Sequence, residues 1–410
     1  MKKFSILFLL VTLFGQIAIT DINGYGKEYK SLDPAAISIG ESWLYSNRYN
    51  KSTFNALSSL ISLDMTSISM FSSFGKISTN NEFQQSKQSI DLFNFSFPFK
   101  KNNVISIGVS PLTESDFIII DNDLSVVPGN EFSEPIAYSN KYDIIGGVSQ
   151  LQIGFSSKIH DQYSFGIKWN KLFGNQFSYH TNYIYSISYN ILGEGIYNLS
   201  DSSFSYTANK FNGSIIDLDG RKQFNKNSSV SFLLSLSLPI SILTTQSINS
   251  VQSDSQIFNF YNMHLKRFAL GYTNMFNNKT SYIIEWHYIN SNKGNQELMI
   301  LNQNSPTVHS LHCGFFGQII NFQSSLMNSA SLGIGMNVKR IELNDINSYD
   351  FSMSLGTSIN YANNSNFVDL SFQIGNIFNP NKFVDSQYYT KINLGITAGD
   401  LWFSTKRREN

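Results

Sequence analysis

Apolar and polar residues alternate along most of this chain with a period of two. Residues 388–403 show the pattern, since Ile392, Leu394, Ile396 and Ala398 take the even positions and Lys391 to Gly399 fill the odd ones with mostly polar or small residues. Alternation of this kind is typical of β-strands, because successive side chains of a strand point to opposite faces. The pattern recurs throughout the sequence, at 93–99, 230–238, 349–361 and 368–374.

The alternation predicts an all-β protein with a long series of short strands. Fifteen segments fit, at 57–71, 89–99, 104–120, 142–159, 163–173, 181–191, 203–219, 230–241, 262–276, 281–291, 308–320, 329–343, 349–361, 366–378 and 388–403. Bacterial barrels of one chain usually have an even number of strands. If residues 174–202 form a single excursion, fourteen strands remain, with short turns on one side and long connections on the other, although the sequence leaves open whether 181–191 forms a strand of the barrel.

The polar half of the alternation indicates which environment the apolar half faces. Charged residues make up 14% of the chain and aromatic residues 14%, and the polar positions are mostly Ser, Asn, Gly and Gln. These residues suit a wet, confined lumen, so the apolar positions such as Leu370 and Phe372 should face lipid and Ser371 and Gln373 the lumen. Tyr388 and Trp402 bracket the last strand at a distance of roughly 33 Å along a tilted strand, which fits the two aromatic girdles of a membrane barrel.

The N-terminus has the three parts of a secretory signal: Lys2 and Lys3, an apolar run over 4–14, and a small-x-small site over 18–20. We therefore expect a cleaved signal peptide over 1–20. The apolar run is too short for a spanning helix, so any membrane crossing should be made by strands. Cys313 is the single cysteine, which excludes a disulfide framework.

Three stretches give the chain a resemblance to the FadL-like family of outer-membrane transport barrels for hydrophobic compounds. These stretches are "GYGKEYKSLDPAAISIGESWLYSN", "IGVSPLTESDF" and "INLGITAGDLWF". The resemblance implies a transmembrane antiparallel β-barrel of about 14 strands over 54–410, with a short N-terminal plug over 21–53. Its members commonly carry Asn-Pro-Ala in the plug, where this chain has Asp33-Pro34-Ala35. The resemblance also implies the outer membrane of a Gram-negative-type bacterium and contact with its lipids.

Pro111 interrupts the third expected strand of the barrel, one residue after Ser110. Proline has no N–H for a ladder hydrogen bond, so within a closed barrel it should lie at a bulge or a break. Because FadL-like proteins have a kinked third strand with a lateral gap, the resemblance implies that Ser110 and Pro111 mark a lateral gate. The other interpretation places this proline at the rim of the strand or in a loop.

Two pairs of residues that include histidine are candidates for a chemical role. His309 and His312 are an odd number of positions apart and should point to opposite faces, which argues against one metal site. Glu285 and His287 should share the lumen face, where they could act as a catalytic or gating pair, although a polar lumen contact explains them as well. Without a nucleophile motif beside them, we expect no enzyme, no metal and no cofactor.

These observations lead to two functional hypotheses. The first is a passive channel for hydrophobic small molecules, for example fatty acids, with the ligand-binding residues unknown. The alternative is an outer-membrane assembly barrel, or a secretion-system attachment scaffold, that acts through its outer loops on an unknown protein partner. A net charge of zero does not indicate nucleic acid as a partner.

Overall fold

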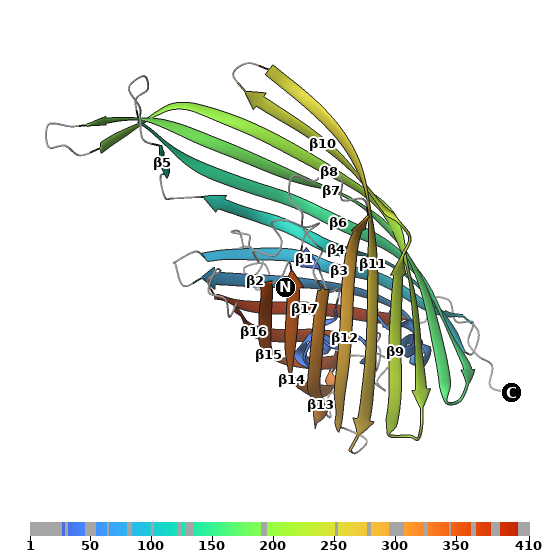
Figure 1. The fold of residues 1–410 in the computed structure, drawn as a ribbon. Helices are drawn as coiled ribbons and strands as arrows, with labels where there is room; N and C mark the ends of the chain where they lie inside the picture. The colour runs from blue at the N-terminus through green and yellow to red at the C-terminus, as the bar shows by residue number, and fades with distance from the viewer. Residues whose placement is uncertain are drawn as a thin grey trace.

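A computed structural model gives the fold of the chain (Figure 1). It describes residues 27–28, 32–45, 55–63, 65–79, 84–99, 102–120, 125–127, 135–189, 195–250, 253–276, 280–294, 307–322, 327–343, 346–361, 366–378 and 386–400. The expected signal peptide, most of the expected plug and Trp402 lie outside these residues. No helix among the described residues is long and apolar enough to cross a membrane.

The strands form one closed antiparallel barrel of fourteen strands, as the alternation predicts. Neighbouring strands pair in chain order, and the last strand pairs with β2 to close the ring. The first half of the ring contains β2 (Thr66–Thr79), β3 (Gln84–Phe99), β4 (Asn103–Ile120), β6 (Ile136–His160), β7 (Tyr163–Tyr189), β8 (Gly195–Gln223), β9 (Ser228–Ser237) and β10 (Ile240–Ser250). The second half contains β11 (Ser253–Met275), β12 (Thr280–Gly294), β13 (Thr307–Asn321), β14 (Met327–Leu343), β15 (Ile346–Tyr361), β16 (Phe367–Phe378) and β17 (Gln387–Asp400).

Two strands share one position in this ring. β9 pairs with the end of β8 that follows Ser214, and β10 pairs with the part of β8 that precedes Gly213; both also pair with β11. Pro239 separates them, because it cannot donate to the ladder. The very short β1 (Lys27–Glu28) and β5 (Ser125–Val127) are additional to the ring and pair with β4 and β6.

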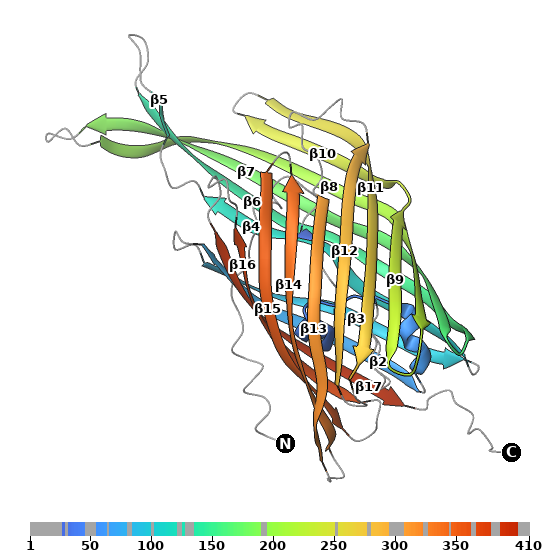
Figure 2. The same cartoon turned by 60° about the horizontal axis from the view of Figure 1, so that its bottom comes forward.

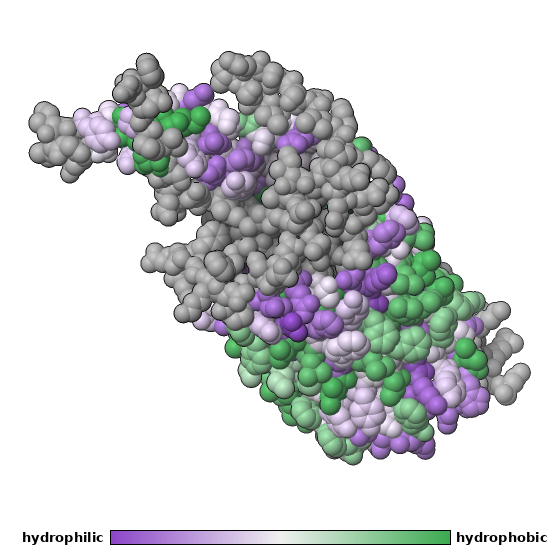
Figure 3. Space-filling model, viewed as in Figure 1, coloured by the Kyte–Doolittle hydropathy of each residue, from purple (hydrophilic) through white to green (hydrophobic). Residues whose placement is uncertain are grey.

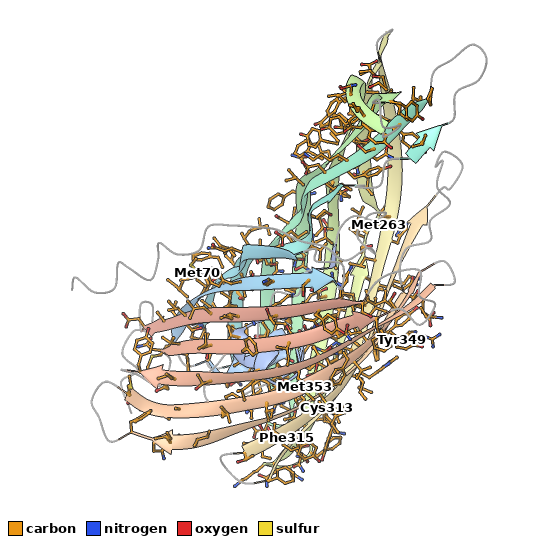
Figure 4. All side chains as sticks on the ribbon, turned by 90° about the vertical axis from the view of Figure 1, so that its left-hand side faces the viewer. Met70, Met263, Cys313, Phe315, Tyr349 and Met353 are labelled. Carbon is orange, nitrogen blue, oxygen red and sulfur yellow. The ribbon has the colours of Figure 1, made fainter. Side chains whose placement is uncertain are left out.

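The lipid-facing and lumen-facing positions follow the predicted alternation. Leu370 and Phe372 are about half exposed, whereas Ser371 and Gln373 are buried inside the barrel. The exposed apolar residues gather on the lower part of the barrel as drawn in Figure 3. Figure 4 labels Met353, Cys313 and Phe315 on the strands of this wall, with Cys313 half-buried on the same side of β13 as the lipid-facing Phe315. The chain is therefore a membrane β-barrel in its surface as well as in its topology.

The structure corrects three expected segments. The single excursion expected over 174–202 is not a loop, because residues up to Tyr189 continue β7 without interruption, and the described part of 181–191 forms no separate strand. The first expected strand, 57–71, begins only at Thr66, and a 3-10 helix, η2 (Leu57–Ser62), precedes it. The connection between the strands expected at 230–241 and 262–276 is largely the hairpin of β10 and β11. Alternation alone does not say where a strand leaves the membrane, which explains the errors at β7 and β10, and a short apolar run such as that of η2 cannot be told from a strand by its period.

A segment of the chain that precedes β2 lies inside the barrel (Figure 2). We call residues 32–45 and 55–63 the lumen segment. It contains α1 (Pro34–Ser38), which contacts β14 to β17, and η2, which contacts β4, β6, β7 and β8. Asp33 caps α1 by accepting a hydrogen bond from the Ala36 amide at 2.6 Å, and Pro34 suits the first turn because it has no N–H to satisfy.

β6, β7 and β8 extend beyond the rest of the barrel and lean away from it, with the β10–β11 hairpin beside them (Figures 1 and 2). We call residues 136–145 of β6, 175–189 of β7 and 195–211 of β8 the wing. The bend lies at glycines, because Gly146 and Gly174 have φ angles of 112° and 148°, which other residues rarely adopt. A Cβ at Gly146 would overlap the Asn175 carbonyl oxygen, so the two strands approach closely where the sheet bends.

Candidate functional site

Glu285 holds the lumen segment to the barrel wall. Its carboxylate accepts hydrogen bonds from the Ser42 hydroxyl, from the Trp43 amide at 2.8 Å and from the Leu44 amide at 3.0 Å. The carboxylate is fully buried, so the hydrogen bonds replace the water that it loses. Glu285 is therefore a structural anchor between β12 and a segment more than two hundred residues earlier in the chain.

His287 and His312 continue this anchor along the wall. His287 Nε2 lies 2.8 Å from a Glu285 oxygen, and its ring stacks between Trp43 and His312 with centroid distances of 4.3 Å and 4.1 Å. His312 Nδ1 donates to the Gly40 carbonyl at 2.6 Å, which leaves Nε2 to accept from the Ser310 hydroxyl at 2.8 Å. The predicted lumen position of Glu285 and His287 agrees with these contacts, and His309 points to the opposite face, where it stacks on the lipid-facing Trp286.

A second anchor holds Glu41, which has a φ of 59°. Its carboxylate pairs with Lys339 at 2.9 Å and accepts a hydrogen bond from the Gln373 amide at 2.8 Å. Lys339 also pairs with Asp350 at 3.1 Å, and the Tyr389 hydroxyl donates to that carboxylate at 2.8 Å. Glu41 and Asp350 are buried, and the Lys339 ammonium between them compensates part of their negative charge.

Glycines of the wall make room for the lumen segment. A Cβ at Gly335 would overlap the Gly40 nitrogen, one at Gly314 would overlap the Ile39 carbonyl oxygen, and one at Gly333 would overlap the Ser38 hydroxyl. Without side chains at these positions, the backbone of the segment packs directly on β13 and β14. We call this surface the glycine cradle.

A third anchor fixes η2 on the opposite wall. Asp219 of β8 accepts hydrogen bonds from the Leu57 amide at 3.1 Å and from the Ser58 amide at 2.7 Å, which are donors of the first turn that no helix bond satisfies. Leu57 packs against Gly154 and Gly166, where a Cβ would collide with its side chain. The described lumen segment is thus bound to both sides of the barrel.

Ser110 and Pro111 lie on β4, on a different wall from Glu285 and His287. Ser110 accepts hydrogen bonds from Gln150 and Gln152 at 3.0 Å and 3.1 Å. The pairing of β4 with β6 shifts register between Pro111 and Thr113. Within the described residues, β3 pairs with β4 up to Phe93 and Val109, and beyond Pro111 the short β1 pairs with β4 at Thr113 and Glu114.

An apolar cluster lies inside the barrel next to this bulge. It joins six residues of the lumen segment with buried residues of several strands. The former are Leu32, Ala36, Ile37, Trp43, Leu44 and Ala56, and the latter are Leu112, Val148, Leu172, Phe211, Ile215, Leu233, Ile240, Ile242, Met263, Leu265, Ala269 and Ile289. The sequence did not predict this cluster, because its strand residues occupy lumen-facing positions of the alternation, where polar residues were expected.

The wing carries an aromatic face on the side that continues the lipid-facing surface of β7. On this face Tyr179 stacks with Phe204 and packs on Tyr206, with centroid distances of 5.9 Å and 5.1 Å. Phe177, Tyr183, Tyr185 and Tyr189 have the same parity on β7. The other face is mostly polar and includes His180, which stacks flat on Tyr142 at 4.3 Å; burial lowers the pKa of this imidazole.

Sequence reasoning missed the anchors at Asp219, Lys339 and the glycine cradle. A signal was present, since Gly314, Gly333 and Gly335 are concentrated on the lumen-facing positions of two consecutive strands. The donors that meet the carboxylates come from the lumen segment, and nothing in the strand pattern specifies which strand it should touch.

The fold is similar to those of solved outer-membrane channels. The structures include a Pseudomonas aeruginosa FadL homologue (TM-score 0.58, 10% identity, covering 91% of this chain and 99% of that one) and the CymD monoaromatic hydrocarbon channel (TM-score 0.56, 9% identity, covering 90% and 97%). A deletion mutant of the TodX monoaromatic hydrocarbon channel is similar at a TM-score of 0.54 and 10% identity, covering 92% and 100%. These likenesses confirm the FadL-like barrel expected from the sequence, at the level of fold.

A comparison with curated protein sequences finds no match. The sequence profile of one family, described as BamG, matches residues 28–410, which covers the whole barrel and the lumen segment. The chain therefore belongs to the BamG family.

Proposed function

We propose that this barrel is an outer-membrane scaffold that binds a partner protein through its wing and so serves in assembly at the outer face. The observation that carries the proposal is the length of β7 and β8, which have 27 and 29 residues. A tilted strand needs about 9–11 residues to cross the hydrocarbon core, so more than half of each strand lies outside it. The extension therefore provides surface that crossing the membrane does not itself require.

The surface of the wing suits protein recognition. Its aromatic face combines Tyr and Phe side chains, and the opposite face and the strand ends are rich in Ser, Asn and Thr. Tyrosine gives large contact area at low cost in conformational entropy, while Ser and Asn adapt their hydrogen bonds to a partner. Aromatic residues left exposed in water, such as Tyr189 and Tyr197, mark interaction sites when they form a patch.

The state of the lumen supports the same proposal. The lumen segment is anchored at Glu285, Glu41 and Asp219, and its described residues are almost all buried. Glu285 and His287 are occupied in holding the segment, which supports the expectation that the chain is not an enzyme. The family's name, BamG, also hints at assembly.

Shortening the wing tests this function. The variant removes residues 179–206 and joins Ser178 to Thr207, which face each other across the two strands, through an Asn-Gly turn. We expect a barrel that still inserts, because all membrane-crossing residues remain, but that loses the partner captured by chemical cross-linking of intact cells and identified by mass spectrometry.

The matched control shortens the neighbouring β10–β11 hairpin by joining Gln246 to Ile257, which also pair with each other. This variant should keep the partner. Loss of the partner from both variants, or from neither, would contradict a specific role of the wing.

A second function, passage of hydrophobic small molecules such as fatty acids, is favoured by the bulge at Pro111. The pairing of β3 and β4 ends just before this residue, and the apolar cluster with Leu112 lies directly inside. Together these features would form a lateral gate at Ser110 and Pro111 and an apolar site behind it. CymD and TodX, whose folds are similar, are monoaromatic hydrocarbon channels.

Uptake of toluene by intact cells that carry the barrel in the outer membrane tests this second function, because the polar outer leaflet of that membrane slows free diffusion of an apolar solute. Pro111→Val restores a ladder donor and should slow uptake, while Pro98→Val, in β3 at the other end of the barrel, should leave it unchanged. Equal uptake by the wild-type protein and Pro111→Val would reject the lateral gate. Because the wing is intact in both variants, the result is independent of the partner experiment.

A further inference from the structure

Among the described residues, the beginning of β8 has a paired strand on one side only. β10 pairs with β8 from Asn212 to Phe204 and then turns back into β11 after Ser250. β8 begins nine residues earlier than this pairing, at Gly195, and residues 195–203 pair with β7 alone among the described residues. We call residues 195–203 the open edge.

The open edge is the outer strand of a sheet in which β6 covers β7 up to Ser186. Beyond Ser186, at the tip of the wing, residues 195–197 and 187–189 form a ribbon of two strands among the described residues. Residues 195–202 are all exposed, including the apolar Ile196, Tyr197 and Leu199 at 47%, 44% and 59%. A hairpin of two strands is marginally stable in water, and a third strand is what usually makes such a sheet stable. The tip of the wing is thus an incomplete sheet.

The open edge has little protection against pairing: its protective features are the register shift at Ser200 and the carboxylate of Asp201. Natural edge strands are usually short or carry Lys, Pro or a covering element. Here the edge reads "GIYNLSDSS", with neither Lys nor Pro and with Asp201 as its single charge. Its nine residues present about 30 Å of strand, which is enough for a complete partner strand.

We propose that the open edge binds an extended segment of a partner polypeptide by β-strand addition, in continuation of the line of β10. This inference rests on the proposed function and specifies how the wing holds its partner. The occupant follows from the chemistry of the edge, since a row of alternating N–H and C=O groups is complementary to another strand in main-chain hydrogen bonding.

The two faces of the sheet at the open edge define the side chains of the bound segment. Leu199 and Tyr197 lie opposite Tyr185 and Ile187 of β7, so this face is aromatic and aliphatic. On the other face, the Ser186 hydroxyl donates to the Asn198 carbonyl, and small polar residues dominate. The bound segment should therefore alternate large apolar residues with Ser, Thr or Asn, and the near absence of charge at the edge sets no requirement for charge in the segment.

The first experiment uses the full-length barrel in detergent and a synthetic peptide that copies Ile240–Ser250, the strand that β8 already accepts further along. Hydrogen–deuterium exchange should slow at least tenfold at the amides of the open edge when the peptide is added. A peptide N-methylated at alternate residues, which keeps every side chain but loses main-chain donors on one edge, should have no effect.

The second experiment covers the edge within the chain. Lengthening the β10–β11 hairpin by eight alternating Thr and Val residues on each strand extends β10 over residues 195–203, and peptide binding should fall at least tenfold. An insertion of the same length made of Gly and Ser cannot form a strand and should leave binding intact. Slow exchange of the edge amides in the Thr/Val variant confirms that it is folded and covered.

Three outcomes would overturn the inference. They are unchanged exchange at the edge with the peptide, equal peptide binding to the covered variant, and cross-links that show a second copy of this chain at the edge. If the wing deletion loses its cellular partner but the covered variant keeps it, the scaffold function stands and strand addition is wrong.

Discussion

The lumen and the wing use the same alternating strands for opposite purposes. Inside the barrel, Glu285, His312 and Asp369 are fully buried, and the first two bind groups of the lumen segment. In the wing, polar and aromatic side chains of β7 and β8 remain accessible. The polar groups of the lumen are thus bound by a segment of the same chain, whereas the side chains of the wing remain accessible to another molecule.

The largest effect should come from removing the main anchor of the lumen. Glu285→Ala leaves the Trp43 and Leu44 amides and the Ser42 hydroxyl without their acceptor, and each buried donor left unsatisfied costs about 1–3 kcal/mol. We expect the lumen segment to leave its site and the variant to conduct ions in planar bilayers.

The matched control for this prediction is Glu342→Ala, which removes an exposed carboxylate paired with Arg340 at 2.8 Å on the outer surface. An exposed pair of this kind contributes little, so conductance should equal that of the wild-type protein. A Glu285→Ala variant that conducts no ions would contradict this prediction and show that the anchors at Glu41 and Asp219 hold the lumen segment without it.

Overfilling the glycine cradle should displace the same segment without removing a hydrogen-bonding group. In Gly335→Val the new side chain meets the backbone of Ile39 and Gly40, which cannot move aside as a flexible side chain would. Protease sensitivity of the lumen segment in the folded barrel should therefore increase. Gly75→Val is the control, because a Cβ there makes ordinary contacts of 3.4 Å and 3.6 Å.

A charge introduced on the lipid-facing surface of the barrel should have a smaller effect on folding. Phe372→Arg places a charge in the hydrocarbon layer at a cost of about 2–4 kcal/mol, and we expect less folded barrel by heat-modifiable gel mobility. Phe372→Leu should fold normally. Ser371 does not provide the control that an open lumen would offer, because its side chain is buried, accepts a hydrogen bond from Asn393 and lies beside the lumen segment.

The smallest perturbation is a single thiol that reports which side of the membrane a residue occupies. In a Cys313→Ser background, Asn198→Cys in the wing should react with an impermeant maleimide on intact cells. Asn225→Cys, in the short turn after β8, should react only after the outer membrane is opened. Labelling of Asn225→Cys on intact cells would invert the topology and place the wing in the periplasm.

The strand pattern of the barrel could be predicted from the sequence because lipid imposes a strict alternation on every crossing strand. The same regularity explains the failures, since Tyr179 and Tyr183 continue the parity of β7 after the membrane has ended. The anchors could not be predicted, because Glu285 meets Ser42 across 243 positions and alternation carries no information about such a pair. The role of Ser110 and Pro111 as a lateral gate stays a prediction. The structure has a register shift beside Pro111, and the pairing of β3 with β4 ends at Val109 among the described residues.

The glycine cradle also has a consequence for the order in which the molecule is built. The lumen segment precedes β2, yet it rests on β13 and β14, which the ribosome makes much later. The ring closes between β2 and β17, so the segment must be enclosed before or while these two strands meet. Contacts between such distant parts of a chain form slowly, because a long loop has to close first. Closure of the barrel and seating of the lumen segment should therefore be one late kinetic event, and a chain truncated before β13 should keep its N-terminal segment accessible to protease.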